Sequence, residues 1–191
     1  METFSTKIVN NIQEWRSRKL EKSAHFLLNI GISANVLTFF ALLCGLLAVY
    51  FLFNNTFLFL LFALLHLLAD AFDGVIARLT TTTSLGKFFD HILSDGLVTI
   101  LPIIKMGFFL NDLYAYLAAG LFALALLFYA LSQYQAPIWF MRLYVVMGIF
   151  IILLFPSLKF LFIVLYLSVA VAGAYSLARQ LQWFLQKRHT S

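Results

Sequence analysis

Four aspartates in one short stretch of this chain have the chemistry of a catalytic or ion-binding site. They lie between residues 68 and 96 and make up four of the eight acidic residues in the protein, namely Asp70, Asp73, Asp90 and Asp95. Long apolar segments flank the stretch on both sides. Because carboxylates are costly at membrane depth, a cluster of them there indicates a functional site.

The spacing of these residues places them on the faces of two helices. Asp70 and Asp73 are three residues apart and share one helix face. Gly74 lies beside that face, where the missing side chain lets a ligand approach the backbone. Gly86 and Asp90 are four residues apart and share a face of the next helix. A short turn between two antiparallel helices would bring both acidic faces to about the same depth.

Metal ions are the expected partners of this cluster. Carboxylates this close repel one another in a low dielectric, so either several are protonated or cations lie between them. Oxygen ligands favour Mg²⁺, Mn²⁺ or Ca²⁺. Two such ions would form a site for displacement at phosphorus, because they neutralise the phosphate and activate the attacking oxygen. Arg78 adds a positive charge where an anionic phosphate would arrive.

The composition indicates which class of protein carries the cluster. The 191 residues are 63% hydrophobic and 11% charged, which is too little charge to cover a soluble domain. Alternating strand patterns are absent, so the sequence predicts helices. Basic residues lie mostly at segment ends, so the net charge of +5 indicates membrane orientation and not nucleic-acid binding. The single cysteine, Cys44, excludes an internal disulfide and a cysteine-based metal site.

The predicted fold is all-α: a polytopic membrane protein with six transmembrane helices and an N-terminal amphipathic interfacial helix. Residues 1–31 form the amphipathic arm, and the whole chain, 1–191, is one domain. Ser84 is a plausible N-cap of the third span, and Pro137 fits the first turn of the fifth. The apolar segments cover about residues 33–53, 56–79, 85–110, 113–131, 137–155 and 158–183. The excess of basic residues at one side predicts that both termini and the acidic cluster are cytoplasmic.

The acidic stretch resembles the signature of the CDP-alcohol phosphatidyltransferases (class I). The similar residues are Asp70-x-x-Asp73-Gly74-x-x-Ala77-Arg78, then seven residues, then Gly86-x-x-x-Asp90. The start of the first span, Ile32 to Thr38, is also similar to that family, with Ala34 where a proline is usual. The six-span layout agrees broadly as well.

The resemblance implies a membrane enzyme of phospholipid biosynthesis that works at the cytoplasmic face. It would bind a CDP-linked lipid or small alcohol, transfer the substituted phosphate to an acceptor alcohol and release CMP. Mg²⁺ or Mn²⁺, as two ions, and a homodimer are implied as well. If the matching residues have the roles of the family motif, Asp70, Asp73 and Asp90 are metal ligands, and Asp95 is a ligand or the base. Gly74, Ala77, Arg78 and Gly86 would then contact the CDP group.

The last aspartate departs from the family pattern. The family places it four residues after the position of Asp90, where this chain has Ser94, and Asp95 comes one residue later. On a regular helix Asp95 would be rotated by about 140° from Asp90. A π-bulge would absorb the extra residue. Alternatively, when the spacing is counted from Arg78, Asp95 takes the position of the family's last aspartate and His91 takes that of its third. As a third alternative, Ser94 takes the position of the base and the site is impaired.

Three further polar residues have two interpretations each. His91 is either a ligand or proton shuttle, or a hydrogen-bonded residue without a chemical role. Arg142, near the start of the fifth span, either binds the phosphate of an acceptor such as inositol phosphate or glycerol phosphate, or snorkels to the interface. His66, one turn before Asp70, is expected to be a buried structural residue.

Other functions compete with the phosphotransferase. An intramembrane prenyltransferase also uses aspartates and Mg²⁺, but its second aspartate-rich motif is absent from this sequence. A cation or proton transporter would need carboxylates across the membrane, whereas these stay at one face. A catalytically impaired relative that acts in binding or assembly is the third alternative, and only the position of Asp95 favours it.

Overall fold

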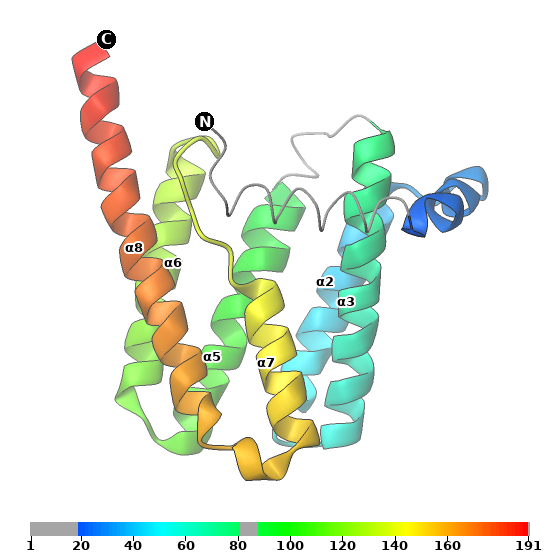
Figure 1. Cartoon of the computed structure of the whole chain (residues 1–191), viewed down its shortest axis with the longest axis horizontal. Helices are drawn as coiled ribbons and strands as arrows, with labels where there is room; N and C mark the ends of the chain where they lie inside the picture. Colours follow the sequence, from blue (N-terminus) through cyan, green and yellow to red (C-terminus); the bar gives the residue numbers. More distant parts are fainter. Residues whose placement is uncertain (1–18, 81–87, 191) are drawn as a thin grey trace.

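A computed structural model describes residues 19–80 and 88–190, without the side chains of Phe89 and of residues 188–190. Within this part of the chain every regular element is a helix, and the long helices run side by side in one bundle (Figure 1). Five of these helices are long and apolar enough to cross a membrane. The predicted all-α polytopic membrane protein is therefore confirmed, although a sixth full-length span is not.

Helices α2 (Ala34–Phe51) and α3 (Thr56–Leu79) form an antiparallel pair that carries the first half of the acidic stretch. The turn between them contains Asn54 and Asn55. Asn55 is the N-cap of α3, and its side chain accepts a hydrogen bond from the backbone N–H of Leu58 at 3.1 Å. Cys44 of α2 is buried.

The third crossing begins as a π-helix, η1 (Phe88–Leu97), and continues directly as α5 (Val98–Leu110). It ends at Asn111, which has the left-handed φ of 52° that asparagine tolerates. Asp112 then caps α6 (Leu113–Leu131) by accepting the Tyr114 N–H at 2.9 Å. Ser84, the predicted N-cap, and Gly86 lie outside the described residues.

The fifth crossing begins later than predicted. Residues 137–141 are not helical, and α7 covers Arg142–Leu154, so Pro137 does not occupy a first helical turn. The Trp139 N–H donates to Ser176 Oγ at 3.0 Å, so a contact with another helix satisfies this backbone donor. With 13 residues, α7 is about 20 Å long and shorter than the roughly 30 Å hydrocarbon core.

The last crossing is longer than predicted. A short 3-10 helix, η2 (Pro156–Leu158), precedes α8 (Leu161–Thr190), which extends past the neighbouring helices at its C-terminal end (Figure 1). Apolar side chains from all six long helices meet in one core. Its fully buried members include Leu52, Ala63, Ile103, Phe122, Val145 and Val169.

The predicted amphipathic arm is described only from residue 19 onward. Residues 19–29 are helical and, coloured blue in Figure 1, lie across the direction of the bundle. Ala24 is fully buried against Val75 and Ile76 of α3. This short helix therefore packs beside the half of α3 that carries the acidic residues.

Candidate active site

Asp70 and Asp73 lie in the C-terminal half of α3, on the face that their spacing predicts. Asp70 is partly buried, and Asp73 is only 6% exposed. The buried Oδ2 of Asp73 has no hydrogen-bond partner among the described residues. A buried carboxylate oxygen without a donor is costly, so this atom is suited to hold a cation.

The π-helix brings Asp90 and Asp95 together. Its hydrogen bonds run from residue i to residue i+5, so residues five apart lie one above the other. Of the three alternatives for Asp95, the structure thus has the π-helical one, and the π-helix absorbs the extra residue that separates Asp95 from the family spacing. Both carboxylates now face the same side of the third crossing, where Asp95 is 7% exposed.

Arg142, the first residue of α7, lies at the centre of the cluster. Its guanidinium forms ion pairs with Asp70, with Asp90 at 3.4 Å and with Asp95 at 2.9 Å. It also donates a hydrogen bond to Ser94 Oγ. The residue is only 8% exposed, so a fixed positive charge offsets part of the repulsion among the carboxylates.

These contacts answer part of what the sequence left open for Arg142 and Ser94. Arg142 does not snorkel to an interface, because its charged end is buried among carboxylates. Its contact with an acceptor phosphate stays a prediction. Ser94 is fully buried and engaged by Arg142, whereas Asp95 has an oxygen close to His91.

Two groups of potential metal ligands meet in this cluster. One contains Asp70, Asp73 and Asp90, and the other contains Asp90, His91 and Asp95; within each group the ligand atoms lie within 4.8 Å of one another. Asp90 belongs to both groups. The first group offers only carboxylate oxygens, which suit Mg²⁺ and Mn²⁺. The residues therefore fit the two ions that the sequence predicts.

Two more of the predicted residues, Ala77 and Arg78, lie in the last turn of α3, and His66 lies near its middle. The Arg78 Nε donates to the Gly74 carbonyl one turn earlier at 2.7 Å, and its side chain is exposed. Ala77 is partly buried on the same turn. His66 is fully buried and its Nδ1 lies 2.7 Å from the Ala41 carbonyl, which confirms the predicted structural role.

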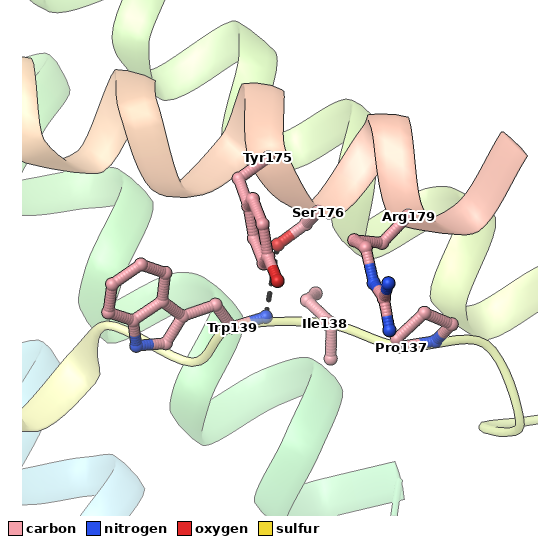
Figure 2. A pocket seen from close by; sticks show the side chains of 6 residues that line it. All are labelled: Pro137, Ile138, Trp139, Tyr175, Ser176 and Arg179. Atoms are coloured by element: carbon pink, nitrogen blue, oxygen red, sulfur yellow. Dashed lines mark hydrogen bonds between the residues drawn. The ribbon is translucent and has the colours of Figure 1, made fainter. Parts of the chain in front are cut away.

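Residues 137–141 hold two parts of the site in place. Phe140 stacks on the His91 ring with centroids 5.1 Å apart, and Arg142 follows directly after the segment. Figure 2 shows the segment passing along α8, tied by the hydrogen bond from Trp139 to Ser176. A cavity of about 260 Å³ lies between them, lined by Pro137, Ile138, Trp139, Tyr175, Ser176 and Arg179. The sequence showed no signal for this tether.

The chain belongs to the CDP-alcohol phosphatidyltransferase family. The family model, described as CDP-alcohol phosphatidyltransferase, matches residues 31–174, which is most of the chain and includes all four aspartates. The resemblance inferred from the sequence is thus confirmed. Comparisons with curated proteins and with solved structures gave no match.

Membership defines the general activity. The protein is a transferase that moves a phosphate-containing group from a CDP-alcohol donor to an alcohol acceptor. Its apolar helices place it in a lipid bilayer as an integral membrane protein. The family generally uses a divalent metal, and the acidic groups described above have the ligands to bind one.

Proposed function

We propose that this protein transfers a phosphatidyl group from a CDP-linked lipid to a small alcohol or phosphorylated polyol, with release of CMP, in phospholipid biosynthesis. The single observation that supports this most is the gathering of four carboxylates from two helices around Asp90, in two overlapping ligand groups. A bilayer-embedded site suits a donor whose reacting phosphate is attached to a lipid. The family membership supplies the reaction type.

Asp70, Asp73 and Asp90 would hold one ion, and Asp90 and Asp95 would hold the second. When bound, Mg²⁺ or Mn²⁺ would supply positive charge to the donor phosphate and activate the attacking oxygen. Gly74, Ala77, Arg78 and Gly86 would contact the CDP group. A site on the predicted cytoplasmic side, where Arg78 and Arg179 add positive charge, favours anionic substrates.

In the proposed reaction, the hydroxyl oxygen of the acceptor attacks the donor phosphorus that carries the lipid. A new phosphorus–oxygen bond forms, the bond from phosphorus to the CMP oxygen breaks, and the hydroxyl proton passes to Asp95. A carboxylate has enough lone pairs to face an ion and accept this proton as well. Arg142 would hold Asp70, Asp90 and Asp95 in position throughout.

The structure gives less support to the alternatives. The π-helix removes the displacement of Asp95, which was the reason to suspect an impaired enzyme. A transporter would need acidic groups along its path. Asp112 lies at the opposite end of the bundle, where it caps α6 and accepts a hydrogen bond from Tyr166, so it does not continue such a path. Homodimer formation is proposed from the family resemblance alone.

Release of CMP tests the proposal. Purified protein in phospholipid vesicles would receive CDP-diacylglycerol, Mg²⁺ or Mn²⁺, and a panel of acceptors that includes glycerol phosphate, inositol phosphate and inositol. We expect CMP to appear with at least one acceptor, to stop with EDTA and to return with added metal. Asp73→Asn should reduce the rate to background, whereas Glu21→Gln, on the exposed face of the helix over residues 19–29, should not. Absence of CMP with every acceptor when CDP-diacylglycerol is the donor would refute the proposal, even if CDP-linked small alcohols release CMP.

A further inference from the structure

His91 faces both carboxylates of the π-helix. Its Nδ1 lies 3.8 Å from Asp90 Oδ2 and 3.6 Å from Asp95 Oδ2. The other oxygen of each carboxylate, Oδ1, points to Arg142 instead. Each carboxylate therefore has one oxygen on the guanidinium and one oxygen near the imidazole.

The distances around His91 are too long for hydrogen bonds but suit an ion between the groups. Hydrogen bonds from N–H to oxygen span about 2.7–3.2 Å. Two ligand atoms that each lie about 2.1 Å from the same metal ion are separated by no more than about 4.2 Å. The separations of 3.6 and 3.8 Å fall within this limit.

Aromatic side chains fix the His91 ring in this orientation. Phe140 stacks on the imidazole with an angle of 19° between the planes, and the Tyr129 ring lies nearly perpendicular to it at a centroid distance of 6.0 Å. Nδ1 itself is shielded from solvent and has no hydrogen-bond partner among the described residues. The ring is thus held with an unsatisfied nitrogen toward two carboxylate oxygens.

We propose that His91 Nδ1 is a ligand of the second metal ion, together with Asp90 and Asp95. This inference rests on the proposed function only in taking the cluster as a metal site. The second position would then have one nitrogen ligand, whereas the first has only oxygen ligands. Because imidazole favours transition metals over Mg²⁺, the second position should prefer Mn²⁺ more strongly than the first does.

Electron paramagnetic resonance tests this proposal without any turnover. Purified protein in detergent is titrated with Mn²⁺ until two ions are bound per chain, and the electron spin echo modulation is recorded. We expect coupling to ¹⁴N in the natural protein and its replacement by ¹⁵N coupling after labelling with ¹⁵N-histidine. His91→Gln should lose the nitrogen coupling and bind the second Mn²⁺ more weakly by at least the roughly tenfold found for lost outer-shell partners.

His66→Gln is the matched control. That imidazole is also buried and lies within electrostatic reach of Asp70 and Arg142, but its Nδ1 lies against the Ala41 carbonyl. Its coupling and Mn²⁺ affinity should equal those of the natural protein. Binding of the first Mn²⁺ by His91→Gln shows that the variant is folded, and the isotope labelling needs no variant at all.

The result can separate this inference from the proposed function. Two bound Mn²⁺ ions without nitrogen coupling, or coupling that survives His91→Gln, would overturn the ligand role while leaving CMP release unaffected. Nitrogen coupling that depends on His91 supports the ligand role even in a preparation that releases no CMP. Coupling that is lost only in His66→Gln would also overturn the proposal.

Discussion

Arg142 Nε lies 2.9 Å from Asp95 Oδ1, which ties the first residue of α7 to a carboxylate on the π-helix. The same guanidinium reaches Asp70 on α3, so one side chain joins three separate elements. Because Arg142 is buried, these ion pairs are poorly screened by solvent. One positive charge is therefore shared among several carboxylates, and a change to any member alters the others.

Asp95 should be more important for turnover than Ser94. We expect Asp95→Asn to lower the rate of CMP release by about 10²–10⁴-fold, as for loss of a general base. Ser94→Ala removes one hydrogen bond to Arg142 and should cost less than about tenfold. CMP release at saturating donor measures both. Equal losses in the two variants would argue against Asp95 as the base.

Removal of the positive charge of Arg142 should destabilise the protein and make its stability depend on bound metal. Arg142→Gln leaves three carboxylates without their partner, and breaking a buried ion pair costs about 3–5 kcal/mol. Thermal unfolding in detergent should show a lowered Tm that Mn²⁺ raises by more than it raises the Tm of the natural protein. An identical Mn²⁺ response in both proteins would contradict this role for Arg142.

The hydrogen bond between Trp139 and Ser176 should matter for both stability and activity. Ser176→Ala leaves the Trp139 N–H without its acceptor, at a cost of about 1–3 kcal/mol. CMP release should fall as well, because residues 137–141 would no longer hold Phe140 and Arg142 in position. Ser168→Ala, which removes a hydroxyl bonded within α8 to the Leu165 carbonyl, is the control and should change neither property strongly. Unchanged activity in Ser176→Ala would show that the segment does not need this tether.

Two glycines offer a matched test of helix packing. A Cβ at Gly173 of α8 would lie 2.9 Å from the Phe122 backbone nitrogen on α6, and a backbone atom cannot easily move. Gly173→Ala should therefore destabilise the protein by about 1–3 kcal/mol. A Cβ at Gly120 meets nothing within 4 Å, so Gly120→Ala should be stabilising by about 0.5–1 kcal/mol. Thermal unfolding compares the two, and a similar Tm in both variants would rule out close α6–α8 contact.

The sequence predicted those features that depend on local spacing. The shared face of Asp70 and Asp73 follows from helix geometry, because residues three apart lie on one side of a helix. The π-helical position of Asp95 could also be predicted as one alternative, because an extra residue beside a functional site is a known setting for π-helical turns.

Contacts between residues far apart in the chain could not be predicted from the sequence. Pro137 favours a helix start, but residues 137–141 are not helical, Trp139 is hydrogen-bonded to Ser176 of α8, and α7 begins at Arg142. The pairing of Arg142 with Asp70 depends on where that helix begins. The stacking of Phe140 on His91 depends on the same segment, so all three features were missed for one physical reason.

Asp90 belongs to both groups of potential ligands, and this sharing has a consequence for the order of loading. An ion at one position withdraws charge from the carboxylate that the other position also uses. Since such coupling is reciprocal, neither ion would bind independently of its neighbour. A titration with Mn²⁺ should then show two unequal affinities, with the weaker one belonging to whichever position is filled last.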